Sequence, residues 1–205
     1  VPFNIFPVGA DKAPLISGWQ SKATQDPEQI AEWRTTGVQA WGIPTGARNG
    51  LFVIDLDVDK ETGERLGELM LRQANGYAHL LDKINVRTPS GGAHIYLQHF
   101  DGARNSTSKL APHVDTRGEG GYVVAPGSVT AGGVYKGTYP ALEPVPFGLR
   151  AMLLRQPLPP ASDRTFDRDV TSDEVTELLS HIPADLPYDD WVSVLMALHD
   201  RYSGS

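Results

Sequence analysis

The stretch Leu51-Phe-Val-Ile-Asp-Leu-Asp57 is the strongest strand signal in the chain. Its apolar residues favour a β-strand, and two acids end it. Side chains at i and i+2 of a strand share one face, about 6–7 Å apart along the chain. Carboxylates so placed repel each other, so Asp55 and Asp57 predict a site for Mg²⁺ or Mn²⁺. The alternative is that they begin a loop. Asp59 continues the alternation, but the Lys-Glu-Thr-Gly after it favours a loop or helix-entry role.

A third acid follows apolar Val114 and precedes a glycine-rich turn. This residue, Asp115, shares the face of its predicted strand with Arg117. Two metal ions need bridging and flanking oxygen ligands, so a third carboxylate on a strand is the expected complement to the first two. Taken alone, Asp115 fits a turn residue equally well.

A candidate anion site lies between these two segments. Ser90-Gly91-Gly92 predicts a tight turn whose backbone amides and hydroxyl suit a phosphate. His94 follows this turn on the next predicted strand, which makes it a candidate phosphate donor. The alternative for His94 is a structural hydrogen bond, which is the commoner role for a single histidine on a strand.

The other secondary-structure signals place these residues in an α+β fold. Pro27 is predicted at the first position of a helix that Gly37 ends, and a second helix is predicted at about 63–74. Further strands are predicted at 84–88, 94–98, 113–116 and 122–125. Adjacent strand pairs alternating with helices predict an α+β sheet with helices on one side.

Composition sets the broad class of the protein. The chain has 205 residues, of which 40% are hydrophobic and 21% charged, as in ordinary globular domains. No apolar run reaches the roughly 18 residues of a membrane helix. The lack of cysteine excludes disulfides and thiolate zinc sites, so any metal must be held by Asp, Glu or His. No signal segment opens the sequence, which predicts a cytoplasmic setting. The start at Val1 and the end in Ser-Gly-Ser predict a fragment of a longer protein.

The charge distribution divides the chain. Residues 1–160 carry 15 basic and 15 acidic side chains, whereas residues 161–205 carry three against ten and supply the whole net charge of −7. An acidic average therefore does not exclude a polynucleotide substrate. The predicted division is a catalytic domain at 1–153, a Pro-rich linker at 154–170 and a helical module at 171–205. The module's two predicted helices, 172–181 and 188–202, are too few to bury a core alone.

The order of three segments resembles one family. Phe52-Val-Ile-Asp-Leu-Asp57, Thr88-Pro-Ser-Gly-Gly-Ala-His-Ile-Tyr-Leu97 and Val114-Asp-Thr-Arg-Gly-Glu-Gly-Gly-Tyr-Val-Val-Ala-Pro-Gly-Ser128 resemble the bifunctional primase–polymerase (prim-pol) domain of the archaeo-eukaryotic primase superfamily. The opening motifs follow in the same order: Pro7-Val8-Gly9, Lys12-Ala13-Pro14, Gly18-Trp19, Ala23-Thr24, Trp33 and Gly42-Ile43-Pro44-Thr45-Gly46. The resemblance covers about residues 5–150.

The resemblance implies a fold and a set of site residues. The implied fold is an RRM-like mixed or antiparallel catalytic sheet with a small N-terminal α/β unit, here followed by a C-terminal helical appendage. Asp55, Asp57 and Asp115 would bind two divalent metals, Mg²⁺ or Mn²⁺. His94, together with the turn Ser90-Gly91-Gly92, would contact the incoming triphosphate. The looser candidates for contact with phosphate or template are Lys12, Arg48 and Arg117. Without cysteine, the zinc-binding insertion of some relatives is absent.

The implied activity is that of a nucleotidyltransferase, both DNA primase and DNA polymerase. Its substrates would be NTPs or dNTPs, and its partners a single-stranded DNA template and a primer. The family occurs in replication proteins of phages, plasmids and mobile elements, often ahead of a helicase domain. Two alternatives stay open: a metal-dependent nuclease or phosphohydrolase, and a non-catalytic module that binds single-stranded DNA or an origin.

Overall fold

The computed structural model describes residues 2–74, 76–154, 171–182, 191 and 194–195. The chain divides into two compact units, Val1–Val145 and Pro146–Ser205. The first unit contains two main sheets and a few helices, and nearly all its strand pairs are antiparallel. The predicted mixed α+β class is confirmed. Among the described residues, no helix combines the length and hydrophobicity of a membrane span.

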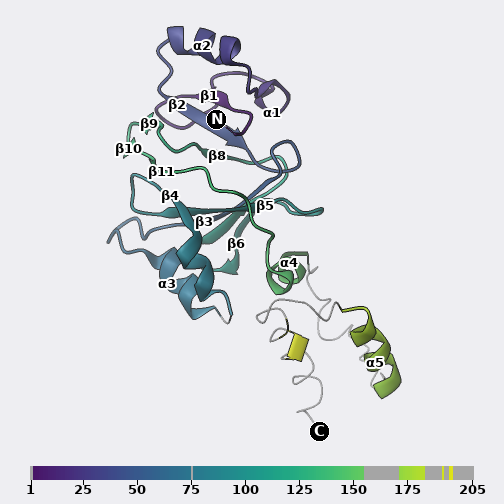
Figure 1. Ribbon diagram of the computed structural model, residues 1–205. Coiled ribbons are helices and arrows are strands. Elements are labelled where there is room, and N and C mark those ends of the chain that lie inside the picture. Colours follow the sequence, from purple (N-terminus) through teal and green to yellow (C-terminus); the bar gives the residue numbers. More distant parts are fainter. Residues whose placement is uncertain (1, 75, 155–170, 183–190, 192–193, 196–205) are drawn as a thin grey trace, which may run out of the picture. The chain divides into compact units, whose positions relative to one another are not determined.

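The larger sheet of the first unit has six strands in the order β11-β4-β5-β3-β7-β6. The strands are β3 (Leu51–Leu56), β4 (Ile84–Arg87), β5 (Ala93–Gln98), β6 (Ser106–Ala111), β7 (Val114–Arg117) and β11 (Lys136–Gly137). The predicted strand at Leu51 is β3, and it lies near the centre between β5 and β7. Helix α3 (Leu66–Gln73) covers one face of this sheet, and the 3₁₀-helix η1 (Ala78–Lys83) leads from it into β4 (Figure 1).

A three-stranded sheet lies over the other face (Figure 1). It consists of β1 (Phe6–Val8), β2 (Ala40–Pro44) and β8 (Tyr122–Val124), in the order β1-β2-β8. Helices α1 (Trp19–Lys22) and α2 (Pro27–Thr35) lie against this sheet, and β9 (Val129–Thr130) and β10 (Gly133–Val134) form a hairpin. The sequence did not predict β1 or β2, because both are short and interrupted by proline or glycine.

The main core fills the space between the two sheets. Leu51 and Val53 of β3 pack there with Ile5, Ile43 and Val123. The alternate residues of β3, Phe52, Ile54 and Leu56, are buried on the opposite face, the face that α3 covers. By strand alternation, Asp55 lies on the same face as Leu51 and Val53 and so points toward the small sheet.

Local signals explain where the helices begin and end. The carboxylate of Asp26 accepts a hydrogen bond of 3.0 Å from the amide of Glu28, Pro27 is the first helical residue of α2, and Gly37 follows the helix with φ of +83°. Helix α3 begins at Leu66, three residues later than predicted. The reason is that Asp59 accepts hydrogen bonds from the amides of Glu61 and Thr62, which hold a loop. The predicted loop role of Asp59 is thereby confirmed.

The second unit contains α4 (Phe147–Leu154) and α5 (Ser172–Ser180). Helix α5 coincides with the helix predicted at 172–181. The predicted linker, apart from its first residue, and most of the helix predicted at 188–202 lie outside the described residues. The division at 153/154 and 170/171 stays a prediction.

Candidate active site

Three polar side chains from separate segments meet on the inner face of the six-stranded sheet. Asp55 of β3 stands directly opposite His94 of β5 on one side and Asp115 of β7 on the other. Residues directly opposite in an antiparallel pair have Cβ atoms about 4.5–5.5 Å apart. Strand register therefore places the imidazole of His94 on one side of Asp55 and the carboxylate of Asp115 on the other.

One guanidinium joins two of the carboxylates. The Nη2 atom of Arg117 lies 3.3 Å from Oδ2 of Asp55 and 3.2 Å from Oδ2 of Asp115. The other oxygen of Asp115 accepts a hydrogen bond of 3.0 Å from the amide of Ser108, which has a left-handed φ of +53°. Asp115 is therefore held from two sides, and Arg117 offsets part of the repulsion between the two acids.

Asp57 is compensated less fully, since the charges of Arg117 and Lys60 offset only part of what raises its pKa. Asp57 is an exposed residue, but it lines the same pocket as Asp55. Loss of hydration, followed by the negative charges of Asp55 and Asp115, raises the pKa of Asp57 above its ordinary value of 3.8. The ionised form of Asp57 is thus disfavoured in the folded chain, as expected for a carboxylate in a group that attracts cations.

Replacing Asp57 with asparagine should stabilise the metal-free protein at pH 7. Folding raises the pKa of Asp57 above 3.8. Between 3.8 and the raised pKa, the folded state therefore holds a proton that the unfolded state has already lost. Unfolding free energy therefore falls across that window and stays lower above it. Thermal melts in chelator should give Asp57→Asn a higher Tm than wild type at pH 7, with the difference shrinking toward about pH 4.

The matched control is Asp59→Asn. Hydrogen bonds from Thr62 and Glu61 lower the pKa of Asp59. Removing the Asp59 carboxylate should therefore leave Tm unchanged or reduce it. A lower Tm for Asp57→Asn than for wild type at pH 7 would contradict the electrostatic account of Asp57.

His94 is almost completely buried beside Asp55. Its Nε2 lies 3.5 Å from Oδ1 of Asp55, and its Nδ1 is buried without a hydrogen-bond partner among the described residues. Burial lowers the pKa of His94, and the nearby charge of Asp55 opposes this only in part. At neutral pH the ring is thus an uncharged imidazole, which has one N–H to donate.

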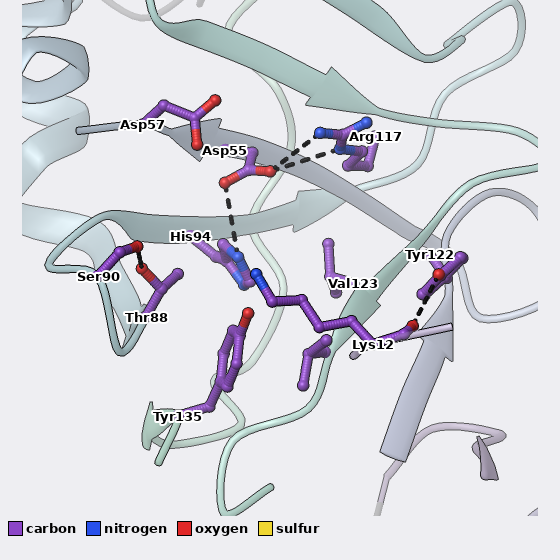
Figure 2. A pocket seen from close by; sticks show the side chains of 11 residues that line it. Lys12, Asp55, Asp57, Thr88, Ser90, His94, Arg117, Tyr122, Val123 and Tyr135 are labelled. Atoms are coloured by element: carbon purple, nitrogen blue, oxygen red, sulfur yellow. Dashed lines mark hydrogen bonds and ion pairs between the residues drawn. The ribbon is translucent and has the colours of Figure 1, made fainter. Parts of the chain in front are cut away.

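These groups line a cavity of about 350 Å³, a volume typical of small-molecule sites (Figure 2). Its lining residues are Lys12, Asp55, Asp57, Thr88, Ser90, His94, Arg117, Tyr122, Val123, Val124 and Tyr135. They come from both sheets of the first unit. The carboxylates lie at one end, and hydroxyl, imidazole and ammonium groups lie beyond them (Figure 2).

The turn between β4 and β5 supplies two hydroxyls. The Oγ1 of Thr88 and the Oγ of Ser90 are 3.0 Å apart. Gly91 has φ of +97°, which glycine adopts without strain, and its amide donates to the carbonyl of Thr88. Gly92 must lack a side chain, because a Cβ there would lie 2.6 Å from the carbonyl oxygen of Leu56. Both glycines therefore shape the turn, and Ser90 and Thr88 face the cavity.

Lys12 reaches the cavity from the loop after β1. It has a left-handed φ of +73°, and its carbonyl accepts a hydrogen bond of 2.9 Å from the hydroxyl of Tyr122. Its ammonium extends toward His94 (Figure 2), and its charge contributes to the lowered pKa of that histidine. The strained backbone and the Tyr122 bond together aim Lys12 into the site.

The structure gathers most of the sequence-predicted residues. Lys12, Asp55, Asp57, Ser90, His94 and Arg117 line the cavity, and Asp115 adjoins it through Arg117. Arg48 does not line the cavity, since its guanidinium donates to the carbonyl of Ala23. The sequence interpretation missed Thr88, Tyr122, Val123, Val124 and Tyr135. The first four belong to the quoted segments and could have been found there, whereas nothing near Tyr135 marked it.

The carboxylates suit a hard divalent cation. No group of three or more His, Asp or Glu side chains within the described ranges meets the geometry of a metal site, and Arg117 engages both Asp55 and Asp115. The donor set nevertheless fits, since carboxylate oxygens are the ligands that Mg²⁺ and Mn²⁺ favour. Burial, and after it the negative charges of Asp55 and Asp115, raises the pKa of Asp57.

Comparison with known proteins gives one family. The family model for the N-terminal domain of bifunctional DNA primase/polymerases, Prim-Pol, matches residues 2–148. This range includes every residue of the cavity. The comparison with curated proteins gives no match.

Proposed function

This chain belongs to the Prim-Pol family of bifunctional DNA primase/polymerases, and we propose that its cavity catalyses template-directed nucleotidyl transfer with two divalent ions. The observation that carries this proposal is the alignment of Asp55 between His94 and Asp115 beside a polar cavity. Asp55, Asp57 and Asp115 would hold the ions. Bound there, the ions would lower the pKa of a primer 3′-hydroxyl and neutralise triphosphate charge.

The chain's own donors orient the nucleotide. Lys12, the imidazole of His94 and the hydroxyls of Ser90 and Thr88 face the cavity beyond the carboxylates. Donors so placed bind the triphosphate tail and aim its α-phosphorus at the 3′-oxygen. The 3′-hydroxyl gives up its proton to solvent as its oxygen bonds to the α-phosphorus, and the bond from the α-phosphorus to the bridging oxygen breaks, so that pyrophosphate leaves.

Arg117 places a positive charge between the carboxylates of Asp55 and Asp115. Its contacts to Asp55 and Asp115 are 3.3 and 3.2 Å long, and it is half-buried. A guanidinium between two carboxylates reduces their repulsion and fixes their orientation. We expect Arg117 to fix the orientation of both carboxylates.

Several finer properties belong to the same proposal. The six-stranded sheet with α3 on one face would be the RRM-like catalytic sheet, and β1, β2, α1 and α2 the small N-terminal unit. Residues 171–205 would form an accessory helical module after a linker. Single-stranded DNA, a primer and NTPs or dNTPs would be substrates. A helicase domain in the full-length protein and replication of a phage, plasmid or mobile element would be the setting.

A primer-extension assay tests the reaction. With Mn²⁺, a labelled primer annealed to a longer template and dNTPs, we expect a ladder of longer products. Shortening of the primer would instead identify a nuclease that uses water as its nucleophile. DNA binding that chelator does not change, without incorporation, would identify a non-catalytic binding module.

A further inference from the structure

Tyr135 is held rigidly in the cavity wall between β10 and β11. Its amide donates to the carbonyl of Ser128 at 3.0 Å, and its carbonyl accepts from the amide of Gly127 at 2.8 Å. The side chain is 4% exposed, and the ring centroid lies 6.0 Å from that of His94. Both the backbone and the ring of Tyr135 are therefore fixed before any ligand binds.

The hydroxyl of Tyr135 has no hydrogen-bond partner within the described part of the chain. It points into the cavity on the side of His94 and Lys12 (Figure 2), and none of the residues that the structure describes hydrogen-bonds to it. Loss of hydration, with the charges of Asp55 and Asp57, raises the pKa of Tyr135 to about 12. The group thus stays an O–H donor at neutral pH. The hydroxyl opens onto the cavity, so a ligand there that supplies an acceptor can pair with it.

The surrounding groups indicate which acceptor the hydroxyl meets. Around Tyr135 lie the hydroxyls of Thr88 and Ser90, the imidazole of His94 and the ammonium of Lys12. The ammonium and the hydroxyls can donate, and the carboxylates lie at the other end of the cavity. A positive charge among hydroxyl donors fits an anion with several acceptor oxygens, such as a phosphate chain.

We propose that the Tyr135 hydroxyl donates a hydrogen bond to the β- or γ-phosphate of the incoming nucleoside triphosphate. This inference rests on the proposed function and assigns a contact on the triphosphate to a residue outside the three quoted segments. Because the ring is already fixed, the contact costs little ordering entropy.

Binding of inorganic triphosphate isolates this contact from catalysis. Titration calorimetry with Mn²⁺ present should give Tyr135→Phe a dissociation constant roughly tenfold to a hundredfold above wild type, the loss expected for a hydrogen bond to a charged acceptor. The same loss should appear with dNTP and with NTP, and in primer extension as a raised KM with little change in kcat.

Tyr96→Phe is the matched control. The Tyr96 hydroxyl is buried and has no hydrogen-bond partner among the described residues. Its ring stacks near that of His94, with centroids 6.3 Å apart, but it does not line the cavity. Its variant should bind inorganic triphosphate as wild type does. Equal loss in both variants would overturn the inference, because a general effect on His94 would then explain it.

Other outcomes separate the alternatives. Unchanged triphosphate affinity in Tyr135→Phe would overturn the contact. A loss confined to NTP, with dNTP unaffected, would overturn it in favour of a sugar contact. Tyr135-dependent triphosphate binding by a protein that extends no primer would support the contact and overturn the proposed reaction.

Discussion

Replacing Asp55 with asparagine is expected to reduce nucleotide incorporation at least about a thousandfold, because a metal-holding carboxylate supplies several kcal/mol of transition-state stabilisation. Asp55 is the central group of the site, with Asp115 and His94 opposite it on neighbouring strands. Asparagine keeps the shape and removes the charge, so the sheet should remain intact. Single-nucleotide incorporation under saturating Mn²⁺ and dNTP measures the effect.

Asp59→Asn is the control for this variant. Asp59 follows on the same alternation, but its carboxylate is engaged by Glu61 and Thr62 in a loop. Its variant should keep wild-type incorporation. More than a tenth of wild-type activity in a folded Asp55→Asn protein would remove Asp55 from the set of metal ligands.

Replacing Gly67 with alanine is expected to destabilise the fold and displace Asp57. A Cβ at Gly67 would lie 2.6 Å from the carbonyl oxygen of His113 and 2.7 Å from the amide nitrogen of Asp57. The amide of Gly67 also donates to the carbonyl of Asp57 at 2.8 Å. All of these neighbours are backbone atoms that cannot rotate away, so α3 must move off the end of β3.

The size of this effect follows from two opposing contributions. Alanine is favoured over glycine inside a helix by about 1 kcal/mol. Overpacking against fixed neighbours typically costs about 1–3 kcal/mol, and more where backbone must shift. We expect the overpacking cost to dominate and to lower Tm by several degrees. We also expect nucleotide incorporation to fall further than the unfolded fraction at the assay temperature would explain.

Gly132→Ala is the matched control for overpacking. A Cβ at Gly132 would meet only Pro89 and Thr130, at 3.7 and 4.0 Å, which is ordinary contact. Its Tm and activity should stay near wild type. A Gly67→Ala protein with unchanged Tm and unchanged incorporation would show that α3 does not position Asp57.

The amino-acid sequence by itself determined the local features of this protein. The apolar run ending in Asp55 and Asp57 specifies a buried strand with acids at its end. Asp26 and Pro27 specify the start of α2. Such features depend on neighbours within a few residues, through side-chain alternation and capping, and are therefore readable without the fold.

Only the tertiary structure decided which groups share the site. The register that sets Asp55 opposite His94 and Asp115 joins segments separated by 39 and 60 positions in the sequence. The same packing directs Arg48 to the carbonyl of Ala23 and brings Tyr135, which no sequence pattern marked, to the cavity wall. A one-residue change of register would turn every side chain of a strand to the opposite face of the sheet. The register is therefore fixed by the burial of a whole strand face, which depends on many residues at once.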